Sequence, residues 1–414
     1  MGVRPPSLLQ AREGARGAVR RRGLPPRADH EARHRVTPLE GIRVVDCSGY
    51  IAGAYAGMML ADLGASVVKV EPLEGEAFRE LPGFYAWNRG KRSIALNLKS
   101  PEGITVVEQL VRDGDVFLEN MRAGVADRLG LGYEKLATIN PRLVYCSVTA
   151  FGSTGPYADR PGFDPLLQAM SGMMALQGFG GPPQYLRIAV TDYYTASLAA
   201  QAMLTGLFVR ERTGRGQRVE TSLLHGSLSL QSGNTVEYAG KPTGFRPSPA
   251  YRLYQAGDEQ WFFLACGNQP IWVRLCRALG LDDLAHDPRF ASWLLRNDNA
   301  ADLMPLLEAR FRTASRAHWL ALLAQHDVPA APVQTLTEFM ANDPAVRHHD
   351  LVREYDHPER GKLRMVGTPI VLSDTPTKDP GRPPTLGEHT EAILHELGYD
   401  DAAIADLRNR GVLR

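Results

Sequence analysis

The segment Ile42-Arg43-Val44-Val45-Asp46 is a short apolar run that ends on an acidic residue. A glycine-rich loop follows, then an apolar helical stretch over residues 54–63, and then a second apolar run over residues 65–70 that leads to Glu71. This order predicts a strand, a helix and a second strand. Strands as apolar as these are typical of a parallel sheet that helices cover on both faces. The pattern therefore predicts an α/β protein with a Rossmann-like parallel sheet.

The same unit raises the question of a dinucleotide-binding site. Glu71 stands where dinucleotide-binding folds place the acid that binds the ribose. The loop glycines, Gly49, Gly53 and Gly57, are spaced four apart, whereas the binding fingerprint requires G-x-G-x-x-G. We therefore expect the fold without the nicotinamide cofactor, and a nicotinamide oxidoreductase is an alternative that failure to bind NAD would remove.

Further alternating elements extend the sheet, and a loop dense in Gly and Pro at residues 151–164 interrupts them. The expected helices and strands lie at residues 101–112 and 193–212, and at residues 115–118, 143–148 and 218–222. From about residue 235 the chain becomes rich in Trp and Pro, and amphipathic helices follow near residues 303–311 and 318–326. This change predicts a smaller inserted α+β domain. The predicted boundaries are 1–36 for an N-terminal tail, 37–225 for the first part of the large domain, 226–345 for the linker and small domain, and 346–414 for a C-terminal segment that returns to the large domain.

Bulk composition excludes several classes of partner. The 414 residues carry 47 basic and 46 acidic side chains, a net charge of +1, so the charge gives no reason to expect nucleic acid or a membrane surface as partner. Polar residues such as Thr195 and Gln201 interrupt the long apolar stretch at 193–212, which argues against a membrane span. The four cysteines lack metal-ligand spacing. We therefore expect no metal and a reducing, cytoplasmic location.

The first 36 residues differ from the rest because they are rich in Arg, Pro and Gly and poor in aliphatic residues. This composition predicts a disordered tail or an extended start. A transit peptide is disfavoured because the stretch contains Glu13, Asp29 and Glu31 and lacks an amphipathic apolar face.

One acidic residue, Asp192, is the leading candidate for chemistry. The run Leu186-Arg187-Ile188-Ala189-Val190 predicts a short strand, and Thr191-Asp192 the turn into the long apolar helix. Open parallel sheets bind ligands at such strand ends. Unpaired backbone amides and the positive end of the helix dipole are expected to keep the carboxylate ionised there. From spacing alone, a simple N-cap is the more frequent explanation of an aspartate before a helix.

Ordered motifs from Leu39 almost to the C-terminus carry a family resemblance. The chain resembles the class III CoA-transferases, the CaiB/BaiF family of formyl-CoA and carnitine-CoA transferase type. The matching stretches are Leu39-Glu40-Gly41-Ile42-Arg43-Val44-Val45-Asp46, Ala61-Asp62-Leu63-Gly64-Ala65, Lys91-Arg92-Ser93-Ile94, Glu119-Asn120-Met121-Arg122, Asp127-Arg128-Leu129-Gly130, Gly152-Ser153-Thr154-Gly155-Pro156, Arg212-Thr213-Gly214-Arg215-Gly216-Gln217 and Leu386-Gly387-Glu388-His389-Thr390.

The resemblance implies an enzyme that moves CoA between an acyl-CoA donor and a carboxylic acid acceptor, with Asp192 as the nucleophile. It implies CoA as a substrate with no tightly bound cofactor, and an interlocked homodimer. The residues that it assigns to CoA binding are Arg128, Arg122, Lys99, Asn120 and the backbone of Ala52.

Two alternatives of related chemistry remain. The α-methylacyl-CoA racemases of the same fold carry His before the aspartate of a Gly-His-Asp motif, but this chain has Gly162-Phe163-Asp164, so one proton carrier is missing. Asp164 either orients the loop or substrate, or accepts hydrogen bonds from loop amides. A catalytically inactive CoA-binding protein is the other alternative. An apolar or aromatic acyl pocket is suggested by Tyr185, Tyr193, Tyr194 and Phe163, although such residues more commonly pack in the core.

Overall fold

The computed structural model describes residues 36–414 apart from 179, 241–247 and 378. The predicted N-terminal tail therefore lies outside the described residues, except for Val36. Residues Thr37–Arg414 form one unit by their contacts. The boundaries proposed above at residues 226 and 346 remain predictions.

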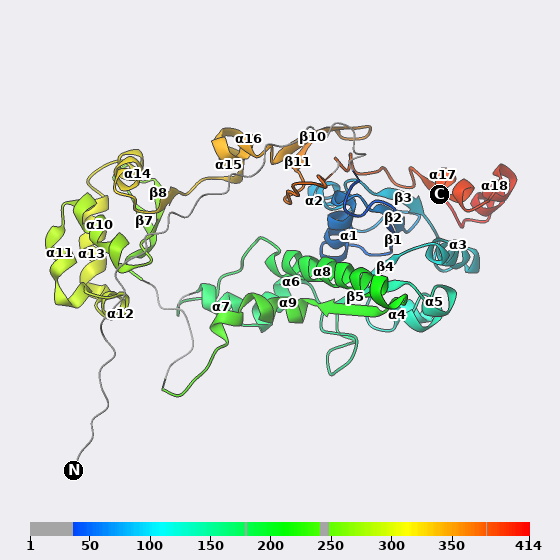
Figure 1. Cartoon of the computed structure of the whole chain (residues 1–414), viewed down its shortest axis with the longest axis horizontal. Helices are drawn as coiled ribbons and strands as arrows, with labels where there is room; N and C mark the ends of the chain where they lie inside the picture. The colour runs from blue at the N-terminus through cyan, green and yellow to red at the C-terminus, as the bar shows by residue number, and fades with distance from the viewer. Residues whose placement is uncertain (1–35, 179, 241–247, 378) are drawn as a thin grey trace, which may run out of the picture. The chain divides into compact units, whose positions relative to one another are not determined.

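Six parallel strands form the main sheet in the order β3-β2-β1-β4-β5-β6 (Figure 1). They are β1 Arg43–Asp46, β2 Ser66–Glu71, β3 Arg92–Ala95, β4 Val116–Glu119, β5 Val144–Thr149 and β6 Arg218–Ser222. Strand β1 pairs in parallel with both β2 and β4, so the strand order reverses beside β1. Open sheets of this kind bind ligands beyond the carboxyl ends of the strands at that reversal. The predicted Rossmann-like parallel sheet is confirmed.

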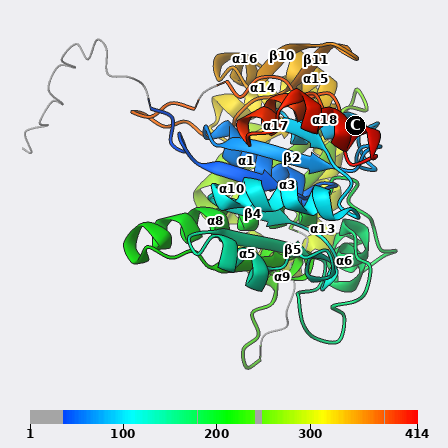
Figure 2. The same cartoon turned by 90° about the vertical axis from the view of Figure 1, so that its right-hand side faces the viewer.

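Helices cover both faces of the sheet because successive strand residues point to opposite sides. Val44 packs with residues of α1 and α8, whereas Val45 packs with residues of α3, α5, α17 and α18 (Figure 2, where the latter helices lie nearest the viewer). The helices of this part of the chain are α1 Ala52–Asp62, α2 Pro82–Trp87, α3 Pro101–Arg112, α4 Val125–Arg128, α5 Tyr133–Ile139, α6 Asp164–Met170, α7 Met173–Gln177, α8 Val190–Thr213, α9 Leu223–Leu230, α17 Thr390–Glu396 and α18 Asp401–Asn409.

Local signals explain the helices that the sequence predicted best. The Ser100 hydroxyl accepts a hydrogen bond from the Gly103 amide, and Pro101 occupies the first turn of α3, where its missing N–H costs nothing. Helix α8 ends at Gly214, whose φ of 72° is a backbone conformation that glycine adopts without strain. The ends of α3 and α8 are therefore encoded close by in sequence.

The predicted strand at residues 186–190 is wrong. Helix α8 already begins at Val190, and the residues before it follow an irregular path with Ile188 71% exposed. In the described chain, residues 186–190 pair with no strand of the main sheet, so they lack the ladder of backbone hydrogen bonds that defines a strand. The side chain of Gln168 instead binds both backbone groups of Leu186.

A second, smaller α+β part has its own apolar core. Its antiparallel sheet has the order β7-β8-β9, and buried Trp272, Phe290, Phe311 and Trp319 pack between this sheet and its helices. The elements are β7 Tyr251–Gln255, β8 Trp261–Ala265, α10 Gln269–Leu279, α11 Asp282–His286, α12 Trp293–Asp298, α13 Ala300–Phe311, α14 Arg316–Gln325 and β9 Ala330–Pro332. The helices α15 Leu336–Asn342 and α16 Pro344–His348 and the hairpin β10 Val352–His357 and β11 Gly361–Val366 follow.

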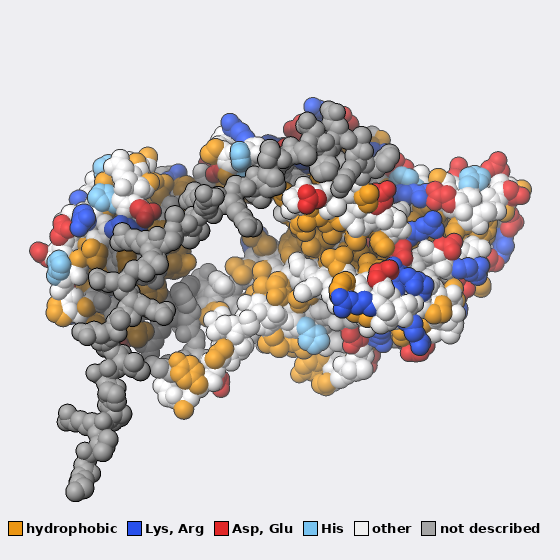
Figure 3. Space-filling view, in the orientation of Figure 1, with side chains coloured by type: hydrophobic (Ala, Val, Ile, Leu, Met, Phe, Trp, Pro, Cys, Tyr) orange, Lys and Arg blue, Asp and Glu red, His pale blue; other side chains and the backbone are white. Residues whose placement is uncertain are grey.

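Hydrophobic side chains also gather on the surface over α1 and α8 (Figure 3). A groove of about 390 Å³ there is lined by Met59, Leu204, Phe208 and Ile370, among others. In the described part of the chain, no helix combines the length and apolarity that a bilayer crossing requires.

Candidate active site

The predicted nucleophile lines a cavity of about 580 Å³ at the carboxyl ends of the parallel strands. Asp192 enters this cavity from the first turn of α8. The loop after β1 contributes Ala52, the loop after β4 contributes Asn120 and Arg122, and the loop after β5 contributes residues up to Asp164. These loops flank the reversal of strand order, which is where open α/β sheets bind ligands.

Asp164 binds the start of α8 from a distant part of the chain. Its Oδ2 accepts hydrogen bonds from the amides of Thr191 at 2.8 Å and Asp192 at 3.3 Å, and its Oδ1 accepts from Gln168 Nε2 at 2.5 Å. The N-cap position of α8 is Ala189, so Asp192 is not an N-cap. Of the two roles expected for Asp164, the geometry provides the acceptance of backbone amides, which also orients the first turn that carries Asp192.

The Asp192 carboxylate is left without a protein partner. Among residues 36–414, outside the short gaps in the description, no hydrogen bond or ion pair reaches its oxygens. Burial, and after it the negative charge of Asp164, raises the pKa of Asp192 to about 7. The expectation of a carboxylate kept ionised by the helix amides is therefore wrong, because Asp164 already occupies those amides.

The loop that leads into α1 is held by Asn120. Its Oδ1 accepts from the Gly49 amide at 2.9 Å, and its Nδ2 donates to the Gly49 carbonyl at 2.7 Å. Gly53 approaches Ser48 so closely that a Cβ there would lie 2.4 Å from the Ser48 Cβ. The side chain of Asn120 thus positions the loop with the very groups that CoA binding was expected to use.

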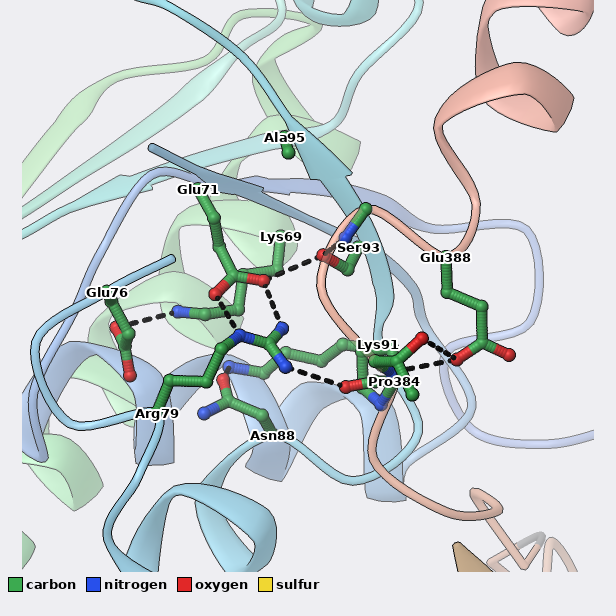
Figure 4. A network of polar contacts seen from close by, with 12 residues as sticks. Lys69, Glu71, Glu76, Arg79, Asn88, Lys91, Ser93, Ala95, Pro384 and Glu388 are labelled. Carbon is green, nitrogen blue, oxygen red and sulfur yellow. Dashed lines mark hydrogen bonds and ion pairs between the residues drawn. The ribbon is translucent and has the colours of Figure 1, made fainter. Parts of the chain in front are cut away.

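A buried ionic network supports this loop from below (Figure 4). Lys69 Nζ donates to the Ser48 carbonyl at 2.9 Å and pairs with Glu76 at 3.1 Å. Lys91 Nζ lies 2.7 Å from Asp46 Oδ2, and both side chains are fully buried. Burial opposes ionisation of Asp46, but Lys91 and Lys69 outweigh it and hold the pKa of Asp46 below its usual range.

The same network explains why Glu71 is no ribose-binding acid. Glu71 is 1% exposed, pairs with Arg79 at 2.6 Å and accepts from Ser93 Oγ at 2.7 Å (Figure 4). Its acceptor positions face other side chains of the fold. This finding weighs against the nicotinamide alternative in addition to the glycine spacing.

The cations predicted for CoA binding do not all meet at this cavity. Arg122 lines it, and also lines a smaller cavity of about 130 Å³ beside Gly124. Arg128, the last residue of α4, is exposed next to Gly124, and Lys99 is exposed in the loop before α3. The structure therefore brings together Asp192, Asp164, Asn120, Arg122 and Ala52, whereas Arg128 and Lys99 lie outside the cavity lining.

Of the aromatic residues proposed for an acyl pocket, half reach the cavity. Tyr185 and Phe163 line it. Tyr193 instead accepts a hydrogen bond from Trp87 Nε1 at 3.1 Å, and the Tyr194 hydroxyl contacts Ser229 Oγ at 3.2 Å. Successive residues of a helix face different directions, which is why neighbours of Asp192 point away from it.

Sequence reasoning assigned no role to Arg160 or Arg187, which also line the cavity. Both lie in irregular loops, where no periodicity assigns a side chain to a face. Their only signal in the sequence is that Arg160 comes four residues before Asp164 and Arg187 five before Asp192.

Other groups in the structure are weaker candidates. A larger cavity of about 740 Å³ next to Tyr55, Trp87 and Tyr193 contains none of the predicted site residues. The four cysteines are buried, and burial raises the pKa of each thiol, which argues against a thiolate nucleophile. No cluster of potential metal ligands occurs among the residues that the structure describes.

Comparison with known proteins agrees with the fold and the motifs. The model of CoA-transferase family III matches residues 39–390. Succinyl-CoA:glutarate CoA-transferase from Mus musculus is 35% identical over 97% of this chain and 96% of its own length. Succinate–glutarate CoA-transferase from Agrobacterium fabrum is 34% identical over 88% of this chain and 96% of its own length. A CAIB/BAIF family crystal structure from Brucella suis matches with a TM-score of 0.77 and 37% identity over 87% of this chain and all of that one.

These matches extend over nearly the whole described chain, and the ordered motifs quoted above lie within them. The chain belongs to CoA-transferase family III and is an enzyme of that class.

Proposed function

We propose that this enzyme transfers CoA from an acyl-CoA to a carboxylic acid through a covalent intermediate on Asp192. The observation that carries the proposal is the partnerless Asp192 carboxylate, which lines a cavity at the carboxyl ends of the strands. Every neighbouring carboxylate with a structural role is bound: Asp164 by amides and Gln168, Asp46 by Lys91. Asp192 alone of these three is available to a substrate.

The chemistry is a chain of acyl exchanges at Asp192. A carboxylate oxygen of Asp192 attacks the thioester carbonyl, the C–S bond breaks, and CoA leaves as thiolate. The thiolate then attacks the aspartyl carbonyl of the mixed anhydride and releases the donor acid, which leaves an aspartyl-CoA thioester. The acceptor carboxylate then attacks the aspartyl-CoA thioester, which gives a second mixed anhydride and frees the CoA thiolate. The thiolate attacks the acceptor carbonyl of this anhydride, which forms the new acyl-CoA and regenerates the Asp192 carboxylate. One thioester is exchanged for another, so no external energy source is required.

The attacking form of Asp192 is the ionised one. Since its pKa is raised to about 7 by burial and by Asp164, the carboxylate is both more basic than an ordinary aspartate and still substantially ionised at neutral pH. The reaction of the free enzyme is thus expected to speed up as pH rises through about 7.

We assign CoA binding to Arg122 at the cavity, with Arg128 and Lys99 outside it, because guanidinium and ammonium groups suit the phosphates of CoA. The Arg128→Met and Arg122→Met variants should raise the KM for acyl-CoA. A matched acyl-pantetheine thioester, which lacks the nucleotide phosphates, should be used equally by these variants and the wild type. Equal losses with both thioesters would contradict a phosphate-binding role.

The acids named for the mouse and Agrobacterium relatives are succinate and glutarate. We take these two acids as the first candidates for donor and acceptor here. Racemisation is not favoured, because Phe163 rather than an imidazole precedes Asp164 at the cavity.

A homodimer is part of the proposal because the family resemblance implies one. The apolar groove along α1 and α8 with Leu204 and Phe208 is a surface that a second copy could bury. Light scattering on the full chain should give twice the monomer mass, and the mass should fall in the Phe208→Glu variant. A monomeric wild type would contradict this part of the proposal alone.

The decisive experiment is to trap the intermediate. The enzyme is incubated with a panel of acyl-CoAs, hydroxylamine is added, and peptides are mapped by mass spectrometry. We expect a hydroxamate on Asp192 for reactive donors and none without donor. Modification of a different residue during turnover, or turnover with no trapped species, would exclude Asp192 as the nucleophile.

A further inference from the structure

Three arginines line the cavity that holds Asp192: Arg122, Arg160 and Arg187. Arg122 follows β4 and also borders the adjacent smaller cavity. The other two belong to the segments that lead into Asp164 and Asp192. They share the lining of this cavity with Asp192.

Arg187 is anchored to the support of the nucleophile. Its neighbour Leu186 donates its amide to Gln168 Oε1 at 3.2 Å, and its carbonyl accepts from Gln168 Nε2 at 3.1 Å. Gln168 is fully buried and also donates to Asp164, which binds the amides at the start of α8. One buried pair, Asp164 and Gln168, thus fixes the backbone beside Arg187 and beside Asp192 together.

The charge of Arg187 is not used within the described chain. None of the described residues makes an ion pair or hydrogen bond with its guanidinium, whereas the Arg160 guanidinium stacks over the Tyr157 ring at 4.0 Å. Neither arginine pairs with Asp192, whose pKa is raised rather than lowered. Arg187 is exposed, so its guanidinium and the Asp192 carboxylate line one cavity without neutralising each other.

We propose that Arg187 determines substrate specificity by binding the distal carboxylate of a dicarboxylic acid, with Arg160 as a second cation beside it. This inference rests on the proposed function, because it places the reacting carboxylate at Asp192. The planar guanidinium matches a carboxylate with two parallel hydrogen bonds. The acid is held at both ends, which positions the reacting carboxylate for acyl exchange.

The test compares two acceptors of equal chain length, glutarate and pentanoate, which differ only in the second carboxylate. For Arg187→Met, kcat/KM for glutarate should fall by about 10- to 100-fold, chiefly through KM, while that for pentanoate stays within about threefold. Arg187→Lys should lie between, because it keeps the charge but loses the paired geometry. Arg160→Met should give a smaller fall. Arg277→Met, an exposed arginine on α10, is the matched control and should change neither value.

Charge reversal gives a second readout. Arg187→Glu should lose glutarate and gain use of 5-aminopentanoate, whose distal group is an ammonium. If Arg187→Met does not fold, the ratio of kcat/KM for glutarate to that for pentanoate in the Arg187→Lys and Arg187→Glu variants tests the proposal instead. Equal use of glutarate and pentanoate by the wild type, or an unchanged ratio in the folded variants, would overturn this inference while Asp192 still becomes acylated. Failure of every donor to acylate Asp192 would instead overturn the proposed function.

Discussion

Asp46 and Asp192 both lie close to a helix start near the carboxyl edge of the parallel sheet, yet their surroundings are opposite. Asp46 is fully buried beside Lys91 at 2.7 Å, and its pKa is held below the usual range. Asp192 has no partner in the described part of the protein, and burial with Asp164 raises its pKa to about 7. The comparison teaches that burial alone does not decide the state of a carboxylate. A cation makes Asp46 structural, whereas a second acid makes Asp192 reactive.

The largest expected effect is the loss of activity when the reactive carboxylate, Asp192, is replaced. Asp192→Asn removes the attacking oxygen charge, so kcat should fall by about 1,000-fold or more while the fold persists. Acyl-CoA turnover and circular dichroism measure the two properties. Asp113→Asn, at an exposed residue after α3, should retain full activity. Substantial turnover by Asp192→Asn would disprove the nucleophile.

The next largest effect is a loss of stability when the structural carboxylate, Asp46, loses its cation. Lys91→Met leaves the Asp46 carboxylate buried without its cation, so the free energy of unfolding should fall by about 3–5 kcal/mol. Urea unfolding measures it. Arg142→Met removes an exposed pair with Glu211 and an exposed hydrogen bond to the Gly214 carbonyl, and should cost about 0–1 kcal/mol. A similar cost for both variants would mean that the network in Figure 4 contributes no more than a surface ion pair.

A third variant changes Asp164, the acid whose negative charge distinguishes the surroundings of Asp192 from those of Asp46. Asp164→Asn removes one of the two causes of the raised pKa of Asp192 and weakens the bonds to the α8 amides. The rise of kcat/KM with pH should therefore move below about 7. The rate should fall by about 10- to 100-fold because the first turn of α8 is less well positioned. Asp159→Asn in the same loop is the control, and an unmoved pH profile for Asp164→Asn would contradict this account.

The smallest effect is on stability. Because the pKa of Asp192 is higher in the folded state than its ordinary value of 3.8, the unfolded chain releases this proton first as pH rises. Between pH of about 4 and 7 the folded state loses stability from this group, and the loss is complete above 7. Asp192→Asn should therefore stabilise the protein by about 1–2 kcal/mol more at pH 8 than at pH 6. A gain independent of pH would mean that the pKa is not raised.

Much of the fold could be predicted because its signals are local. The helix predicted at residues 101–112 is α3, since Ser100 and Pro101 mark its start within one turn. Most strands of the parallel sheet were recognisable as short strand-forming runs, but β3 Arg92–Ala95 was not predicted as a strand. The strand expected at residues 186–190 failed because an apolar run says nothing about whether a neighbouring strand has free backbone groups.

The candidate site was predictable only in part. Ordered motifs pointed to Asp192, Asn120 and Arg122, which line one cavity. The same motifs could not show that the amide group of Asn120 is bonded to Gly49, or that Arg128 and Lys99 lie outside the cavity lining. Arg160 and Arg187 could not be assigned a role because a loop residue has no periodicity from which its direction follows.

The sequence by itself determined the parallel-sheet class, most of its strands, the ends of α3 and α8, and the family, because caps, apolar periodicity and motifs are properties of neighbouring residues. Tertiary structure alone decided the chemistry of the carboxylates. Glu71 is taken by Arg79, Asp46 by Lys91, and the amides next to Asp192 by Asp164, 28 residues earlier in the chain. The charge state of a buried acid depends on which groups the fold brings within a few ångströms, and sequence spacing does not contain that distance.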